Sequence, residues 1–201
     1  MFFSMEKKRF SNIKVLLVDD NKNSYLLIRE FFKKFKDTNC RLQWTASYSE
    51  AVESMRVKAH DVYLVDYRLG DRNGLELLRE AKSGNCCSPI IILTAEADER
   101  TDVEAMREGA ADFLIKGETD AHLLERSIRY SFEHSRTFQA FRESEAKYRN
   151  LIETLPVMFY AVEPNPPYAP IYLSPSFEKF GFKLEDWYNN QDMWVNSLHP
   201  E

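Results

Sequence analysis

The chain has 201 residues, of which 44% are hydrophobic and 29% charged, and its formal net charge is −5. No stretch approaches the roughly 18 apolar residues of a membrane span, and residues 1–10 mix charges with phenylalanines and lack a signal-peptide core. The three cysteines lack disulfide or zinc spacing, and the charge balance disfavours a nucleic-acid-binding surface. We therefore expect a cytoplasmic protein with no membrane segment and no direct nucleic-acid contact.

Short apolar runs alternate with amphipathic segments through the first 130 residues. The predicted strands are Ile13–Val18, Leu42–Ala46, Val62–Val65, Ile90–Leu93 and Phe113–Ile115. Between them, helical spacing of apolar residues appears at 25–35, 51–55, 75–78 and 103–106. Strands that are apolar throughout are typical of a parallel sheet covered on both faces. Residues 12–130 are predicted to form a doubly wound α/β domain, after an N-terminal extension of residues 1–11.

Residues 120–155 contain no glycine or proline and predict one long helix, about 54 Å if unbroken. Its apolar positions show a partial seven-residue spacing, first Leu124, Ser131 and Phe138, and then Phe141, Tyr148 and Leu155. This spacing indicates a homodimer through a coiled coil, although Arg142 and Glu145 interrupt the stripe. The alternative is a monomeric helix whose first half packs on the sheet, and the pattern does not decide between them.

Seven of the eight prolines lie within residues 156–201, which indicates a domain boundary. In this part, Met158–Val162 and Ile171–Leu173 predict a hairpin, followed by short helices at Ser176–Phe180 and around Trp187. Such a half sheet would leave an unpaired edge and exposed aromatic residues, namely Phe177, Phe180, Trp187 and Trp194. We interpret these aromatic residues as a partial core rather than a cofactor site.

Chemically active side chains stand at the ends of four predicted strands. Asp19 and Asp20 follow the first strand, Asp66 the third, Thr94 the fourth and Lys116 the fifth. Because ligands collect at the carboxyl ends of strands in open parallel sheets, these residues are expected to converge. Three carboxylates favour a hard divalent cation, Mg²⁺ above all, and the hydroxyl and ammonium groups suit phosphoryl oxygens. Asp66 would then be the nucleophile that accepts a phosphoryl group.

Each of these residues alone has a simpler interpretation. Asp19 or Asp20, for example, could cap a helix that begins near Lys22. The functional prediction depends on their conjunction, because four strand ends each supply a different part of one phosphoryl site.

Four segments carry a family resemblance: VLLVDDNKNS, DVYLVDYRLGDRNGLELLREA, PIIILTA and GAADFLIKGE. Residues 12 to about 130, which contain them, resemble the receiver domain of a bacterial two-component response regulator. The resemblance implies a flavodoxin-like sheet with strand order 2-1-3-4-5. It also implies a phosphoacceptor signalling domain rather than an enzyme, with a sensor histidine kinase or a phosphotransfer protein as its partner.

The resemblance implies a role for each residue at the strand ends. Asp19, Asp20, Asp66 and the backbone carbonyl of Arg68 would form the Mg²⁺ site. Asp66 would accept the phosphoryl group, and Lys116 would pair with the phosphoryl oxygens.

Thr94 and Phe113 match the family's switch pair, in which the hydroxyl moves toward the phosphoryl group and the aromatic ring rotates inward behind it. One added charge would thereby bias a two-state element. The sequence departs from the family at Gly117, after the strand-end lysine, and at Gly70, after the acceptor strand, because proline is common at both positions. These departures put the geometry of the two loops in question.

Arg68 and Glu96 stand two residues beyond the acceptor and the switch threonine. An ion pair between them across the phosphoryl site would obstruct the attacking water and slow the loss of phosphate. The alternative is an exposed pair that contributes ~0 to 1 kcal/mol.

Residues 143–201 include SEAKYRNLIETLPVMFYAVEPNPPYAPIYLSPSFEKFGF and resemble the opening half of a PAS sensory domain. The resemblance implies a truncated, α+β PAS-like segment at 156–201, joined to the receiver-like part by the helix at 120–155. Phosphorylation would then switch the conformation or dimerisation of a linked PAS or output region.

Two other functions remain open for the sequence. A haloacid-dehalogenase-type phosphatase also uses a strand-end Asp, Mg²⁺ and a Lys, but it requires D-x-D on its first strand, where this chain has Asp-Asp-Asn at 19–21. A receiver-like scaffold that binds partners without phosphorylation is disfavoured, because every catalytic position is present.

Overall fold

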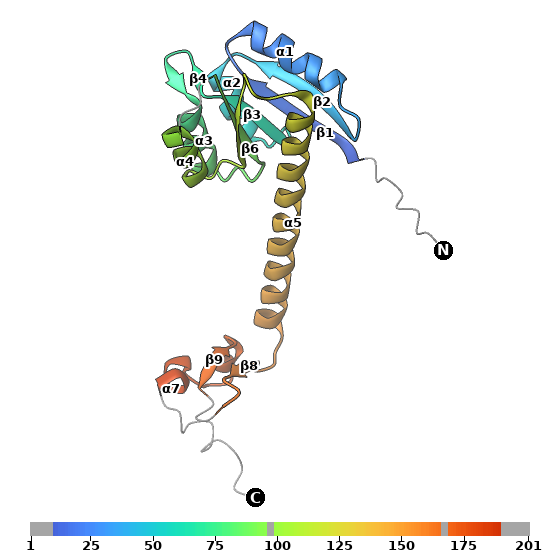
Figure 1. The fold of residues 1–201 in the computed structure, drawn as a ribbon. Coiled ribbons are helices and arrows are strands. Elements are labelled where there is room, and N and C mark those ends of the chain that lie inside the picture. Colours follow the sequence, from blue (N-terminus) through green and yellow to red (C-terminus); the bar gives the residue numbers. More distant parts are fainter. Residues whose placement is uncertain (1–9, 96–98, 166–168, 190–201) are drawn as a thin grey trace, which may run out of the picture. The chain divides into compact units, whose positions relative to one another are not determined.

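The computed structural model describes residues 10–95, 99–165 and 169–189 (Figure 1). The chain divides into two compact units, Met1–Gln139 and Ala140–Glu201. A five-stranded sheet forms the centre of the first unit, with the strand order β2-β1-β3-β6-β7 and parallel pairing throughout. This arrangement confirms the predicted order, 2-1-3-4-5.

The first unit alternates strands and helices along the chain. In order, it contains β1 (Phe10–Val18), α1 (Lys22–Lys33), β2 (Thr38–Thr45), α2 (Tyr48–Arg56), β3 (Val62–Asp66), β4 (Arg68–Leu69), β5 (Arg72–Asn73), α3 (Gly74–Ser83), β6 (Ile90–Thr94), α4 (Glu99–Arg107), β7 (Asp112–Ile115) and α5 (Ala121–Thr154). The five predicted strands are confirmed, although β1 and β2 begin earlier than predicted. The β4–β5 hairpin was not predicted, because two-residue strands leave no periodic signal.

The core occupies both faces of the sheet, as the uninterrupted apolar strands require. On one face, Leu16, Tyr63 and Ile92 belong to a buried cluster with side chains from α2, α3 and α4. On the other face, buried side chains of β1, β3 and β6 pack against α1 and the start of α5. Every residue of β3 and of β6 is buried. Burial on both faces explains why these strands lack polar alternation.

Polar side chains cap the N-termini of the helices that follow the strands. Asn21 accepts the backbone N–H of Asn23 at 2.9 Å and caps α1, and Asn73 caps α3 in the same manner. The alternative interpretation, in which Asp19 or Asp20 caps the first helix, is therefore wrong. Because Asn21 satisfies the helix start, both carboxylates can take part in a site at the sheet edge.

Helix α5 packs on the sheet only at its beginning. Leu124 and Ile128 are fully buried, whereas Phe138, Phe141 and Tyr148 are 55%, 66% and 64% exposed. Packing of the first half on the sheet is thus confirmed, and the aromatic stripe of the second half faces solvent in the single chain. Over the described residues, no helix has the length and apolar character needed to cross a bilayer.

The second unit contains a small hairpin and two short helices. Strands β8 (Tyr160–Val162) and β9 (Pro170–Leu173) pair antiparallel, and α6 (Ser176–Lys179) and α7 (Leu184–Asn189) follow. These elements match the predicted ones. The expectation of exposed aromatic residues is wrong for Phe177 and Trp187, which are buried against Leu173, but right for Phe180, which is 52% exposed. Trp194 lies outside the described residues.

Candidate functional site

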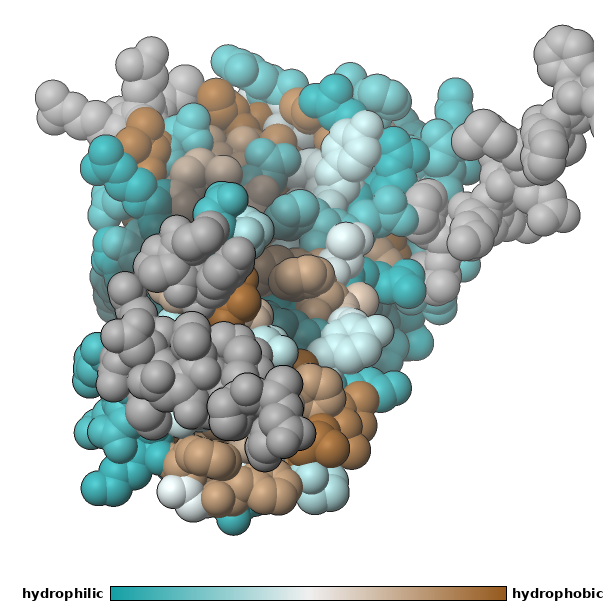
Figure 2. All heavy atoms as spheres, turned by 90° about the horizontal axis from the view of Figure 1, so that it is seen from below, coloured by the Kyte–Doolittle hydropathy of each residue, from teal (hydrophilic) through white to brown (hydrophobic). Residues whose placement is uncertain are grey.

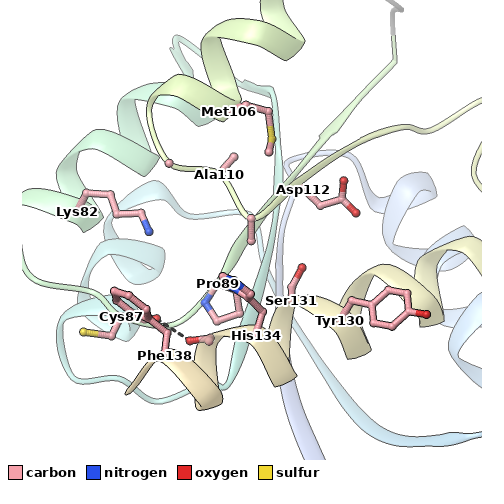
Figure 3. Close-up of a pocket in the computed structure, with 13 residues that line it drawn as sticks. Lys82, Cys87, Pro89, Met106, Ala110, Asp112, Tyr130, Ser131, His134 and Phe138 are labelled. Carbon is pink, nitrogen blue, oxygen red and sulfur yellow. Dashed lines mark hydrogen bonds between the residues drawn. The ribbon is translucent and has the colours of Figure 1, made fainter. Parts of the chain in front are cut away.

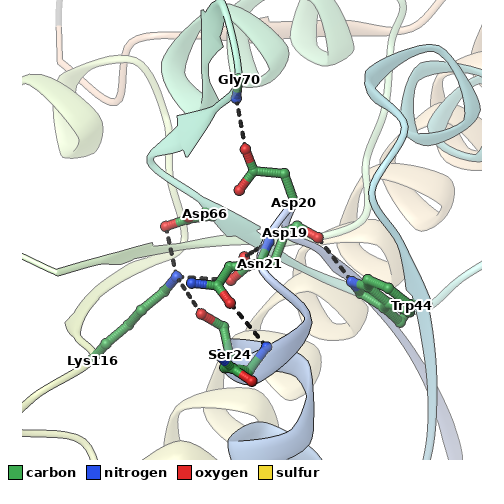
Figure 4. Close-up of polar contacts among 9 residues, drawn as sticks. Asp19, Asp20, Asn21, Ser24, Trp44, Asp66, Gly70 and Lys116 are labelled. Carbon is green, nitrogen blue, oxygen red and sulfur yellow. Dashed lines mark hydrogen bonds and ion pairs between the residues drawn. The ribbon is translucent and has the colours of Figure 1, made fainter.

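Three carboxylates meet at the carboxyl edge of the sheet (Figure 4). Asp19 and Asp20 directly follow β1, and Asp66 ends β3, which is the neighbour of β1 in the sheet. One oxygen of each carboxylate lies within 4.8 Å of the others. Asp19 and Asp66 are buried, whereas Asp20 is exposed. The predicted convergence of these three residues is therefore present in the fold.

The ammonium group of Lys116, which follows β7, is the positive charge that contacts this cluster. Its Nζ lies 2.7 Å from Oδ2 of Asp19 and 2.9 Å from Oδ1 of Asp66, and it donates to Oγ of Ser24 at 3.2 Å. The backbone N–H of Lys116 donates to the carbonyl oxygen of Thr94 at 2.7 Å, which fixes the start of the loop. The ammonium group thus bridges the ends of β1 and β3.

Asp19 is held from several directions, and its side chain has no exposed surface. Its Oδ1 accepts the backbone N–H of Asn21 at 2.8 Å, and its carbonyl oxygen accepts Nε1–H of Trp44 at 2.8 Å. The Trp44 ring stacks on Tyr25 with centroids 4.8 Å apart. These contacts fix the carboxylate in one orientation before any ligand binds.

The β4–β5 hairpin contacts the cluster through Gly70. Its φ of +60° is a conformation that glycine adopts without strain, and its N–H donates to Oδ2 of Asp20 at 3.0 Å. A proline at this position would have no N–H to donate. The departure from the family at Gly70 therefore supplies a contact that orients Asp20.

Gly74 lets α3 begin immediately beside the acceptor strand. A Cβ at this position would lie 2.4 Å from the carbonyl oxygen of Asp66, closer than real side chains approach backbone. The N–H of Gly74 also donates to the carbonyl oxygen of Tyr67 at 2.8 Å. The close approach keeps the segment after Asp66 tight against the helix start.

The two residues predicted to act as a switch lie on neighbouring strands. Thr94 ends β6 and is buried, and Phe113 on β7 pairs with Ile92. The Phe113 side chain is partly buried and packs against the core on the α2–α3–α4 face. Arg68 begins β4 and is exposed, and Glu96 lies outside the described residues.

Residues 15–128 match the family model of the response regulator receiver domain. The chain belongs to the response regulator receiver domain family. Receiver domains are signalling domains rather than enzymes, so the family match leaves the phosphatase alternative without support.

Relatives extend over the receiver part of the chain. The transcriptional regulatory protein ZraR of Klebsiella oxytoca is 30% identical over 124 residues, which are 62% of this chain and 27% of ZraR. The chain thus spans about a quarter of the length of that curated relative. A receiver domain structure from Clostridium thermocellum has a TM-score of 0.56 at 23% identity and covers 63% of this chain and 98% of its own. A BeF3-activated DrrB receiver domain has a TM-score of 0.52 at 22% identity, covering 61% and 99%. At these identities, the two structures support the fold.

Receiver domains generally bind Mg²⁺ at an acidic pocket, and the electrostatics of this chain fit such an ion. Burial raises the pKa of the Asp66 carboxyl above its usual value, the Lys116 ammonium opposes this rise, and the charges of Asp19 and Asp20 add to it. A bound cation would offset the cost of burying the negative charge of Asp66 and would reduce its repulsion with Asp19 and Asp20. The donors are hard carboxylate oxygens, the ligand type that Mg²⁺ prefers.

Sequence reasoning missed three residues of this receiver site: Ser24, Trp44 and Gly74. Ser24 and Trp44 occur within an amphipathic helix and a strand, where periodicity explains them as ordinary surface or core positions. Gly74 follows Asn73 directly before a helical pattern, and a glycine at such a helix start is the signal that could have indicated a close backbone approach.

Proposed function

We propose that this receiver domain accepts a phosphoryl group on Asp66 in a Mg²⁺-dependent reaction, from a sensor histidine kinase or a phosphotransfer protein. The observation that carries this proposal is the buried carboxylate of Asp66, which lies within 4.8 Å of two further carboxylates and 2.9 Å from the Lys116 ammonium. An oxygen of Asp66 forms a bond to phosphorus while the phosphorus–nitrogen bond of a phosphohistidine breaks, and the leaving imidazole takes up a proton from water.

Asp19, Asp20, Asp66 and the backbone carbonyl of Arg68 would hold the Mg²⁺. When bound, the ion neutralises charge on the transferring phosphoryl oxygens. Asp19 is already fixed by the N–H of Asn21, and Asp20 by the N–H of Gly70. The ligands are therefore arranged in advance, which lowers the reorganisation that binding requires.

Lys116 and Thr94 would receive the phosphoryl oxygens. The Lys116 ammonium contacts Asp66 before reaction, so it can pair with the new charge after a small movement. The Thr94 hydroxyl would turn toward the same oxygens. Phe113, partly buried on the neighbouring strand, would then move inward into the space behind it.

The output of this switch would pass along α5 to the rest of the chain. We propose a receiver domain at 12–130, a linker helix at 120–155 that forms a homodimer, and a PAS-like segment at 156–201. Phe141 and Tyr148, which are exposed one heptad apart on α5, support the dimer, and the hairpin followed by two short helices is compatible with the opening of a PAS domain. The free thiols of Cys40, Cys86 and Cys87 are compatible with the reducing cytoplasm, where we place the reaction.

Intact mass after incubation with a small phosphodonor tests the proposal. The chain should gain one phosphoryl group when Mg²⁺ is present and none when it is absent. The Asp66→Asn variant should gain none in either condition. Beryllofluoride, which activates the DrrB receiver domain, provides a second readout. It should shift the resonances of Thr94 and Phe113 only when Mg²⁺ is present. Failure of a folded chain to gain mass would instead favour a scaffold that binds partners without phosphorylation.

A further inference from the structure

A groove opens at the edge of the first unit opposite the acidic cluster (Figure 3). It has a volume of about 700 Å³ and lies where β6 and β7 begin, between the ends of α3 and α4 and the middle of α5. Its apolar lining comes chiefly from Pro89, Met106, Ala110, Tyr130 and Phe138. We call it the α4–α5 groove. It shares no residue with the phosphoryl site, so an occupant here would not compete with Mg²⁺ or phosphate.

Large apolar side chains are exposed along this groove. Met106, Tyr130 and Phe138 are 48%, 61% and 55% exposed. Met106 and Phe138 lie on two sides of one recess, with Pro89 and Ala110 between them (Figure 3). Contiguous apolar surface around a hollow of this size is typical of a site for a small organic molecule.

Two cationic or basic side chains face this recess from opposite sides. Lys82 reaches it from the end of α3, and His134 from α5 (Figure 3). The end of the Lys82 side chain lies close to Gly109, where an added Cβ would be 3.4 Å from Cε and 3.9 Å from Nζ, so the ammonium stands at the part of the groove wall that Gly109 forms. Within the part of the chain that the structure describes, neither Lys82 nor His134 makes an ion pair.

One carboxylate is among the residues that line the groove, and it is already engaged. Asp112 lines the groove, but one of its oxygens accepts the Ser127 hydroxyl at 2.5 Å and the other accepts the N–H of Phe113 at 2.9 Å. Both of its oxygens therefore have donors other than Lys82, and the Lys82 ammonium makes no ion pair within the described residues. An occupant with an apolar body and a negative charge would complement the groove.

We propose that the α4–α5 groove binds a small organic anion with an aromatic or branched apolar body, such as an aryl carboxylate. The apolar body would displace water from Met106, Pro89 and Phe138, and the carboxylate would lie between Lys82 and His134. A peptide helix would instead require a row of apolar pockets along its length, whereas these side chains surround a single recess. The ligand would connect the end of α3 to α5.

Methyl-labelled methionine provides the test, because Met106 is one of six methionines and the only one in the groove. The full chain is titrated with naphthalene-1-acetate and, separately, with neutral naphthalene-1-acetamide. Met106→Leu identifies the Met106 resonance. We expect this resonance to shift saturably with the carboxylate and to respond much more weakly to the amide.

Substitutions then test the charge. Lys82→Ala should weaken carboxylate binding about three- to tenfold, the usual loss for one charged partner at a partly exposed site. Lys147→Ala, which removes an exposed lysine on α5 outside the groove, should leave the affinity unchanged. The other methionine resonances report whether each variant keeps its fold. If Lys82→Ala does not keep its fold, Lys82→Gln replaces it in the test.

Three results would overturn the proposal. The first is an unchanged Met106 resonance at millimolar carboxylate. The second is equal binding of carboxylate and amide, which would mean apolar adhesion without anion recognition. The third is a Met106 resonance that depends on protein concentration without any probe, which would mean that a second copy of the chain occupies the groove.

Discussion

The Lys116 ammonium lies 3.2 Å from the hydroxyl oxygen of Ser24, a contact that joins the loop after β7 to the first turn of α1. Two carboxylates provide its other acceptors. Gly117 follows Lys116, and an added Cβ there would meet nothing within 4 Å, so the loop gains no packing at that point. The Ser24 hydroxyl is therefore a positioning contact for Lys116.

Loss of this contact should slow phosphorylation without abolishing it. Ser24→Ala leaves Lys116 with its two carboxylate partners, so we expect a rate with a small phosphodonor that is lower by about two- to tenfold, as for one hydrogen bond. Ser24→Thr keeps the hydroxyl and should restore the rate. Ser83→Ala removes an exposed serine hydroxyl far from the site and should have no effect; an equal loss there would contradict the positioning role.

Gly74→Ala should destabilise the receiver domain. The new Cβ would lie 2.4 Å from the carbonyl oxygen of Asp66, so the strand end or the helix start must move. We expect a loss of about 1 to 3 kcal/mol in the free energy of unfolding, measured in urea. Gly117→Ala is the matched control, because its Cβ meets open space and should change stability little.

Glu125 stabilises the connection between α5 and the loop before β2. Its buried carboxylate accepts the backbone N–H groups of Lys36, Asp37 and Thr38 at 3.2, 2.8 and 2.7 Å. Glu125→Ala would leave these donors without their acceptor and should cost about 2 to 4 kcal/mol of unfolding free energy in urea. Glu133→Ala, on an exposed turn of the same helix, should stay within about 0.5 kcal/mol of the parent.

The stability of the first unit should fall as the pH drops below the usual histidine range. Burial lowers the pKa of His60 and the nearby Lys14 lowers it further, whereas Asp61 opposes this shift. The neutral ring contacts Oγ of Ser54 at 2.8 Å and Oε1 of Gln43. As the pH falls, the His60 ring of the unfolded chain is protonated first, near its ordinary pKa of 6.5. The contribution of neutral His60 to stability is therefore complete above that pH.

This contribution is lost as the pH falls through the lower pKa of the folded state. Urea unfolding above and below pH 6.5 measures the effect. His60→Gln should flatten the dependence of stability on pH, and His122→Gln, at an exposed position, should leave it unchanged. A slope that persists in His60→Gln would show that another group is responsible.

Light scattering tests the proposed α5 dimer. Phe141 and Tyr148 are one heptad apart and exposed, so Phe141→Glu with Tyr148→Glu should yield a monomer where the parent chain is a dimer. Ala146→Glu adds a carboxylate on another side of the same helix and should leave the dimer intact. Measurements with and without beryllofluoride show whether the switch affects association, and a parent chain that is monomeric in both conditions would contradict the dimer.

The strands and helices were predictable because their signals are local. Val15–Val18 and Ile90–Leu93 are continuous apolar runs, and such runs require cover on both faces wherever they lie in the sheet. The same local patterns placed Asp19, Asp66, Thr94 and Lys116 at strand ends, and parallel pairing then brings strand ends to one edge. The sequence by itself therefore determined the doubly wound class of the first unit and the membership of its acidic cluster, whereas the strand order was implied by the family resemblance.

Only the tertiary structure decided the contacts that orient this cluster. The Gly70 N–H on Asp20, the Ser24 hydroxyl on Lys116 and the approach of Gly74 to Asp66 join segments that no periodicity relates. The burial of Phe177 and Trp187 and the position of Lys82 at the groove also depend on packing. Hydrogen bonds and burial are set by distances in three dimensions, whereas a sequence pattern specifies only which face of an element a residue occupies.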